Sequence, residues 1–157
     1  MSKYDNYPLT DAVREFLAQQ PIKLLINGEW VPANSGKTLP VFDPSSGEII
    51  AQVAAGDAAD IDKAVAAARA ALPDWKAVSP GERAEIIWRL SYLIERDAEH
   101  LAQLDTVSNG LPLDKTLNNE IPAVLDDLRY YAGWTTKLCG RTIPVSIPGF
   151  SVHTKIE

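Results

Sequence analysis

Few of the residues that build catalytic and metal centres occur in this chain of 157 residues. It has one cysteine, Cys139, which excludes an internal disulfide and any metal site built from several cysteines. The two histidines, His100 and His153, do not stand at a spacing typical of metal ligands. No G-x-G-x-x-G motif is present, so the usual fingerprint of a dinucleotide-binding loop is missing. Composition and motifs therefore indicate a domain without visible catalytic machinery.

Long apolar runs and an excess of basic residues are missing as well. The apolar runs are too short to cross a bilayer, so no membrane partner is expected. The N-terminus has neither the apolar core of a secretory signal nor the arginine- and serine-rich pattern of a transit peptide. The net charge of −6 disfavours a nucleic-acid partner. A single soluble domain in the cytoplasm is the expectation that follows.

The stretch from Ile22 to Val53 predicts two or three strands joined by turns. Apolar runs alternate with turn residues there, and Asn27-Gly28 is the strongest short signal for a hairpin. The apolar runs are Leu24–Ile26, Trp30–Val31, Leu39–Phe42 and Ile49–Val53. Gly36-Lys37-Thr38 resembles the end of a phosphate-binding loop. That loop also needs an earlier glycine and a following helix, so a turn between strands is the better interpretation.

Helix signals lie on both sides of these strands. After a lead-in over residues 1–9, a short helix is expected over residues 10–20. Asp57 is a good cap for a second helix, which Pro73 is expected to break, leaving Trp75 to fill the core.

A capping box with proline at the first helical position, Ser79–Glu82, starts the next helix. The remaining helices are expected over residues 80–96, 97–108, 112–119 and 122–140, with breaks at Asp97, at Asn109-Gly110 and at Pro122.

The end of the chain predicts a hairpin. Thr142–Ile147 is apolar, Pro148-Gly149 is a turn signal, and Phe150–Ile156 alternates in polarity. No later segment of the sequence could pair with it, so its edges and faces are left for another chain or for residues outside this sequence. The apolar helix faces also need a surface to cover them, and the chain alone is expected to expose apolar patches and to associate.

Three groups of side chains invite a functional interpretation, and each has a plainer one. Cys139 has basic neighbours in sequence but no histidine, which favours a packed or inert thiol over a nucleophile. Aspartates and glutamates on the helices are interpreted as surface charges with arginine partners; they are Glu95, Asp97, Glu99, Asp126 and Asp127, with Arg96 and Arg129. Aromatic residues are interpreted as core and helix-packing residues: Trp88, Tyr92, Tyr130, Tyr131 and Trp134.

The hairpin stretch also carries a family resemblance. Its motifs I-N-G-x-W, S-G-x-T and D-P-x-x-G-E-x-I-A resemble the opening of the NAD(P)-dependent aldehyde dehydrogenases. The resemblance continues in the family's order through Ala64–Trp75, Ser79–Arg83, Leu104–Pro112 and Tyr130–Pro144. The whole series resembles the N-terminal portion of that family.

The resemblance implies an α/β family fold with a Rossmann-type coenzyme domain. This chain alone would be an α+β fragment of β-hairpins and helices. By resemblance, residues 1–21 are a lead-in and short helix, and residues 22–139 are the N-terminal part of the coenzyme-binding domain. Residues 140–157 resemble one hairpin of an oligomerisation arm, which implies a homo-oligomer, either a dimer or a tetramer.

The family oxidises aldehydes to carboxylic acids with NAD+ or NADP+. Its oxyanion-stabilising asparagine, general-base glutamate and nucleophilic cysteine have no counterparts in this sequence, and Cys139 does not match the nucleophile's motif. The resemblance therefore implies a chain that is inactive and binds no cofactor by itself. The alternative is an assembly or modulatory protein that docks on full-length subunits through the hairpin at residues 140–157.

Two sets of positions can be carried over from the family. Asn119 and Ala123 match positions that line the aldehyde tunnel, and the small Ala123 would leave room for a bulky, aromatic aldehyde. Val41 and Phe42 match backbone ligands of a structural cation, with Ser108 at its acidic position. A neutral hydroxyl compensates the charge of a cation less than a carboxylate does, so this sequence argues against that cation site.

Overall fold

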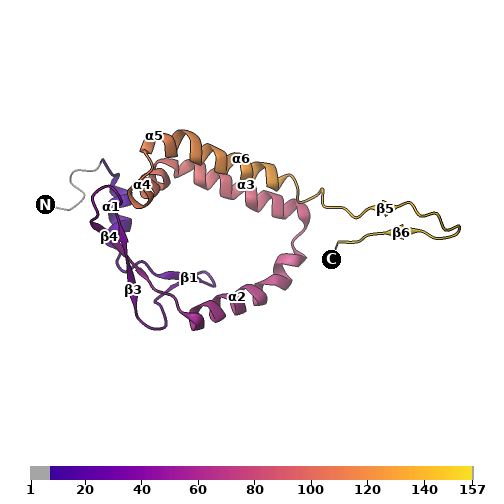
Figure 1. Ribbon diagram of the computed structural model, residues 1–157, viewed down its shortest axis with the longest axis horizontal. Coiled ribbons are helices and arrows are strands. Elements are labelled where there is room, and N and C mark those ends of the chain that lie inside the picture. The colour runs from indigo at the N-terminus through magenta and orange to yellow at the C-terminus, as the bar shows by residue number, and fades with distance from the viewer. Residues whose placement is uncertain (1–7, 157) are drawn as a thin grey trace.

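The computed structural model describes residues 8–156, and its helices form an arch with β-hairpins at one end (Figure 1). Most of the lead-in expected over residues 1–9 lies outside the described residues. A further hairpin projects from the opposite end of the arch, beyond helices α3 (Pro80–Arg96) and α6 (Ile121–Ala132).

The hairpin stretch holds four strands rather than two or three. β1 (Leu24–Ile26) pairs with β2 (Glu29–Val31) in antiparallel fashion. The connecting residues Asn27 and Gly28 both have positive φ, of 54° and 78°, as a tight I′-type hairpin turn requires. β3 (Thr38–Phe42) pairs with β4 (Ile49–Ala54), and the register shifts between Val41 and Phe42. Gly36 lies in the turn between these hairpins, as expected.

Helix α1 (Asp11–Ala18) builds the core together with β4 and α4 (Ala98–Asn109). Its buried face is made by Val13 and Leu17, which pack with Ile50, Ala51 and Val107. The backbone N–H of Thr10 donates to Oε1 of Gln103 at 2.8 Å, which ties the start of α1 to α4. The helix ends two residues before the expected Gln20.

Helix α2 (Ala58–Ala77) begins at Asp57 as expected but runs straight through Pro73. The predicted break is therefore wrong, and so is the core position of Trp75, whose side chain is 42% exposed on the helix surface. Proline removes one helical hydrogen bond, but the alanine-rich sequence before it has high helix propensity. Because α2 is exposed along most of its length, water can also bond the freed carbonyl.

Helix α3 begins and ends where the sequence predicted, and α4 is shifted by one residue at each end. The Ser79 hydroxyl accepts the N–H of Glu82, and the Glu82 carboxylate accepts the N–H of Ser79, which completes the capping box of α3. α3 gives way to α4 at Asp97, and Gly110 closes α4 with a φ of 83°.

The next helical segment changes its helix type twice before it becomes a regular α-helix. A short α5 (Leu113–Lys115) passes into one π-helical turn, η1 (Thr116–Glu120), and then into α6. The prediction that α6 reaches Gly140 is wrong, because its last helical residue is Ala132. Gly133 lowers helix propensity there, and two β-branched threonines follow it at positions 135 and 136.

The projecting hairpin contains β5 (Thr142–Ile143) and β6 (Val152–His153), which pair in antiparallel fashion. The predicted hairpin is confirmed, although the paired part is short. Across residues 8–156, the helices are all too short or too polar to cross a membrane.

Candidate functional site

The two predicted tunnel positions lie together at the junction of η1 and α6. The buried Thr116 anchors this junction, since its hydroxyl lies 3.3 Å from the Pro112 carbonyl. Asn119 is in the π-helical turn and Ala123 is in the first turn of α6, and both are exposed. Because residues four apart lie on successive turns of a helix, the pair presents one surface.

The positions carried over for a cation lie on β3 and α4. Val41 and Phe42 lie at the register shift of β3, and Val41 packs against the core that contains Val107 of α4. The two segments therefore lie close to each other. However, the Ser108 hydroxyl donates back to the Leu104 carbonyl of its own helix at 2.8 Å. Residues 8–156 contain no group of three His, Cys, Asp or Glu side chains that could hold a metal.

Cys139 is exposed in the connection between α6 and β5. The prediction of a packed thiol is therefore wrong, whereas the prediction of an inert thiol stays a prediction. α6 ends before this residue, so no helix buries its side chain. The neighbouring Lys137 directs its ammonium to the Gly133 carbonyl.

The aromatic residues of α3 and α6 are much more exposed than the sequence predicted. Exposed fractions lie between 39% and 62% for Trp88, Tyr92, Tyr130, Tyr131 and Trp134. Some contact one another, and the rings of Tyr130 and Tyr131 meet edge to face with centroids 5.2 Å apart. The prediction that they are core residues is wrong for the described part of the chain, because no second layer of residues covers these rings.

The interpretation of the helix carboxylates as surface charges is confirmed for two ion pairs. Arg96 lies 2.7 Å from Asp97, and Arg129 lies 2.5 Å from Glu95. The hydrogen bonds from Arg96 hold the pKa of Asp97 below its ordinary value. These groups have structural partners, and neither pair flanks a space where a general acid and base could act on a substrate.

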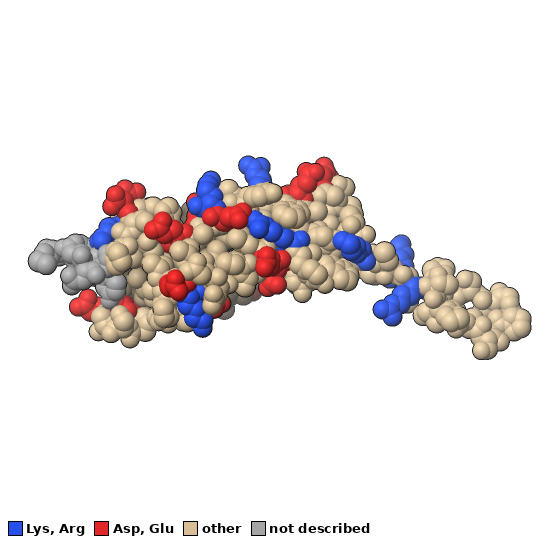
Figure 2. Space-filling model, turned by 90° about the horizontal axis from the view of Figure 1, so that it is seen from above, with Lys and Arg blue, Asp and Glu red and all other residues tan. Residues whose placement is uncertain are grey.

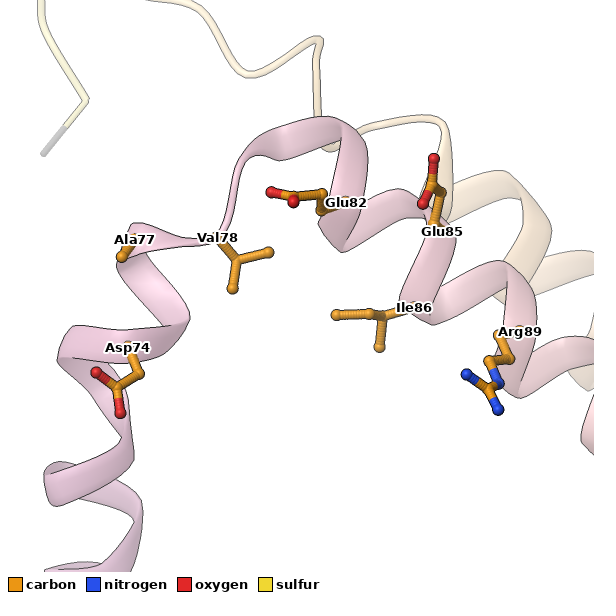
Figure 3. A pocket seen from close by; sticks show the side chains of 7 residues that line it. All are labelled: Asp74, Ala77, Val78, Glu82, Glu85, Ile86 and Arg89. Carbon is orange, nitrogen blue, oxygen red and sulfur yellow. The ribbon is translucent and has the colours of Figure 1, made fainter.

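A cavity of about 580 Å³ lies in the corner between α2 and α3 (Figure 3). Three carboxylates and an arginine line it, together with apolar side chains; they are Asp74, Glu82, Glu85, Arg89, Ala77, Val78 and Ile86. Glu82 is already bound to Ser79, and these hydrogen bonds hold its pKa below the ordinary value. No serine, cysteine, histidine or lysine is among the side chains that line the cavity.

Many large apolar side chains of the described residues are exposed. On α2 and α3 it includes side chains that are between 41% and 61% exposed: Ile61, Val65, Leu72, Ile86, Leu90 and Leu93. The hairpin adds exposed apolar side chains: Ile143, Val145, Ile147, Phe150, Val152 and Ile156. On the face seen in Figure 2, charged side chains of both signs cover the helical body, whereas the hairpin has almost none beyond its base. The expectation of exposed apolar patches is confirmed.

Helix faces of this kind, without an assembled reactive group beside them, are typical of a domain that packs against another part of a protein. Comparison with known proteins gives the family. The model of the aldehyde dehydrogenase family matches residues 30–156. The chain belongs to this family, and the resemblance inferred from its motifs is confirmed.

Individual relatives match over most of the chain. It is 47% identical over 137 residues to mitochondrial aldehyde dehydrogenase family 2 member B4 of Arabidopsis thaliana, which covers 86% of this chain and 25% of that protein. It is 44% identical over 142 residues to the mitochondrial benzaldehyde dehydrogenase of Antirrhinum majus, covering 89% of this chain and 27% of the relative.

A solved structure gives the same result for the fold. The NAD+ complex of an aldehyde dehydrogenase from Bacillus cereus superposes with a TM-score of 0.87 at 42% identity. The match covers 94% of this chain and 30% of that one. The fold is therefore part of an aldehyde dehydrogenase fold, and the chain spans between 25% and 30% of the length of these relatives.

Proposed function

We propose that this chain serves as the N-terminal part of an NAD(P)-dependent aldehyde dehydrogenase. In this function α2 and α3 pack their apolar faces against the nucleotide-binding part of the enzyme. The observation that carries the proposal is the uncovered apolar surface of these helices on a chain that belongs to the family. Covering such a surface is favourable by about 25 cal/mol for each Å² of apolar area removed from water.

In the proposed reaction, the assembled enzyme converts an aldehyde and water to a carboxylic acid. The aldehyde is oxidised and NAD+ or NADP+ is reduced. In this proposal the chain supplies neither the nucleophile nor the general base. Cys139 is exposed in the connection to the hairpin and has no histidine near it in sequence. We therefore expect the chain to be inactive and to bind no coenzyme by itself.

Asn119 and Ala123 would face the aldehyde in the assembled enzyme. Both are exposed on one surface at the start of α6, where a ligand could reach them. The small side chain of Ala123 leaves room for a bulky aldehyde. The similarity to a benzaldehyde dehydrogenase supports an aromatic aldehyde as the substrate class.

Residues 140–157 would join one subunit to a neighbour. The described part of this segment projects away from the body as a two-stranded hairpin (Figure 1). Its apolar side chains are exposed and its strand edges are free to pair with another sheet. The exposed hairpin supports the proposal that two or four subunits associate through it.

The experiment that tests the proposal has two arms. The purified chain is mixed with NAD+ or NADP+ and with acetaldehyde or benzaldehyde, and formation of NADH or NADPH is followed by absorbance. We expect no turnover. The chain is then co-expressed with the part of the Bacillus cereus enzyme that it does not match, and we expect aldehyde-dependent NADH formation. Turnover by the chain alone, or failure of the two parts to co-purify, contradicts the proposal.

The second candidate function is an assembly or modulatory protein, and the projecting hairpin favours it. In that case the chain docks on full-length aldehyde dehydrogenase subunits without completing an active site. Titration of the purified chain into an intact family enzyme distinguishes the two. A saturable change in the rate or in the oligomer size supports the modulatory function.

A further inference from the structure

One face of α3 is organised around a single arginine of α6. Trp88, Ser91, Tyr92 and Glu95 stand at positions i, i+3, i+4 and i+7, so the helical repeat places them on the same face of α3. All four contact Arg129, which follows Glu95 by 34 residues in sequence.

The contacts of Arg129 use both its charge and its flat shape. One terminal nitrogen lies 2.5 Å from the Glu95 carboxylate, and Nε donates to the Ser91 hydroxyl at 3.4 Å. The guanidinium carbon lies 5.7 Å from the centre of the Trp88 ring and 5.8 Å from that of Tyr92. Cations attract aromatic rings at such distances. The Ser91 hydroxyl, which is completely buried, in turn donates to the Trp88 carbonyl at 2.8 Å.

These contacts are directional, and the apolar contacts around them are not. Leu125 and Ala132 are buried on α6 and stand four residues before and three residues after Arg129, so all three lie on the face toward α3. The small Ala132 and Ser91 let the helices come close but do not fix how α6 is rotated about its axis. The forked guanidinium bonds in a defined orientation and therefore does fix the rotation.

The rotation of α6 also orients the surface formed by Asn119 and Ala123. At 100° for each residue, Ala123 lies about 120° around the helix axis from Arg129. α6 is continuous with η1, so a rotation of α6 about its axis would be passed directly to Asn119. η1 also packs on α4, which fixes its other side.

We propose that Arg129 is a positioning residue for substrate selection: through Trp88, Ser91, Tyr92 and Glu95 it fixes the rotation of α6 and thereby places Asn119 and Ala123. The selection step rests on the proposed function of the chain. The positioning step does not, because it concerns contacts within the chain.

The first test measures hydrogen exchange of the complete 157-residue chain by mass spectrometry. Arg129→Gln removes the charge and Arg129→Lys keeps it without the planar fork. We expect amide protection over residues 116–123 to fall about tenfold in the glutamine variant and less in the lysine variant. The matched control is Arg96→Gln, because among residues 8–156 Arg96 pairs with its sequence neighbour Asp97 and with no side chain of α6. Unchanged protection over residues 116–123 in Arg129→Gln overturns the proposal.

The second test uses the enzyme assembled with the Bacillus cereus part and compares benzaldehyde with acetaldehyde. We expect Arg129→Gln to change the ratio of the two KM values about fivefold, which corresponds to about 1 kcal/mol, while kcat for acetaldehyde stays within about twofold. Arg129→Lys should restore part of the ratio, and Arg96→Gln should not change it. Equal loss of kcat for both aldehydes indicates a purely structural role and overturns the proposal. An assembly in which even the original chain is inactive contradicts the proposed function instead, and the exchange experiment still decides the positioning step.

Discussion

The carboxylate of Asp60, in the first turn of α2, accepts the backbone N–H of Asn34 at 3.0 and 3.1 Å. The same carboxylate accepts the N–H of Asp57 at 3.1 Å and so also closes the capping box of α2. Asp60 is only 3% exposed. One side chain therefore joins the turn after the first hairpin to the longest helix, and it does so in its ionised form.

The first prediction follows from this ionised form. The bonds from Asn34 and then Asp57 hold the pKa of Asp60 below its ordinary value. Because the folded-state pKa is lower than the unfolded one, the carboxylate stabilises the fold above the unfolded value. That contribution is lost as the pH falls through the folded-state pKa. We expect Asp60→Asn to speed hydrogen exchange at the start of α2 at about pH 7 and to matter much less at about pH 3.

The control for this prediction is Asp62→Asn, which changes an exposed carboxylate in the same turn of α2. It should leave exchange at the start of α2 nearly unchanged at either pH. An Asp60→Asn effect that is equally large in acid would show that the shape of the side chain, not its charge, makes the connection.

The second prediction concerns the close approach of Gly110 and Pro44. Gly110 ends α4 with a φ of 83°, and a Cβ placed on it would lie 2.8 Å from Cγ of Pro44. Gly110→Ala therefore adds a steric clash to the strain of a left-handed residue, and we expect it to destabilise the chain by about 2 kcal/mol or more. Urea unfolding followed by circular dichroism measures the change in the free energy of unfolding.

Gly36→Ala separates the two causes. Gly36 also has a positive φ, of 68°, but a Cβ there would meet nothing within 4 Å. Its substitution should show the backbone strain alone, about 1 kcal/mol. Equal losses in the two variants would exclude a contribution from Pro44, whereas partial recovery of Gly110→Ala by Pro44→Ala would support one.

Local signals were sufficient to predict where most elements begin. Helix caps bond backbone groups within three residues, so a short stretch of sequence is enough to predict them. Examples are the carboxylate of Asp57 and the reciprocal pair of Ser79 and Glu82. The turn Asn27-Gly28 is equally local. The ends of the helices were harder to predict than their starts, because α2 continues past Pro73 whereas α6 ends at Ala132.

Burial and the long-range contacts could not be predicted in the same way. Trp88 and Tyr92 have the composition of core residues, but whether a ring is covered depends on segments that are distant in sequence. The pairing of Arg129 with Glu95 likewise depends on how α3 packs against α6. Motif spacing predicted the family, which is confirmed, and the tunnel positions Asn119 and Ala123, which stay a prediction. The contacts of Arg129 became visible only in the folded chain.

The third prediction tests the exposed apolar face of α2. Ile61 is 61% exposed and Val65 is 44% exposed, so neither contributes much to the stability of the chain. We expect the double substitution of Ile61 and Val65 by Gln to reduce the fluorescence of bound anilinonaphthalene sulfonate and to leave the urea midpoint unchanged. The same variant should assemble poorly with the Bacillus cereus part. Normal assembly would show that another face makes the contact.

The fourth prediction concerns the base of the projecting hairpin, where two backbones cross at Gly140. The Arg141 N–H donates to the Thr154 hydroxyl at 2.9 Å, and the Thr154 N–H donates to the Arg141 carbonyl at 2.9 Å. A Cβ on Gly140 would overlap the Thr154 carbonyl oxygen. Gly140→Ala must therefore separate the two arms of the hairpin.

If the hairpin joins subunits, Gly140→Ala should weaken self-association, since a displaced hairpin cannot present the same strand edge to a partner. Sedimentation velocity over a range of concentrations measures the effect, and we expect the association constant to fall at least about tenfold while the helical circular dichroism signal is retained. Ser146→Ala, in the exposed part of the same hairpin, is the matched control and should associate normally. Unchanged association of Gly140→Ala would move the subunit contact from the hairpin to the apolar faces of α2 and α3, because these are the other large uncovered surfaces of the described residues.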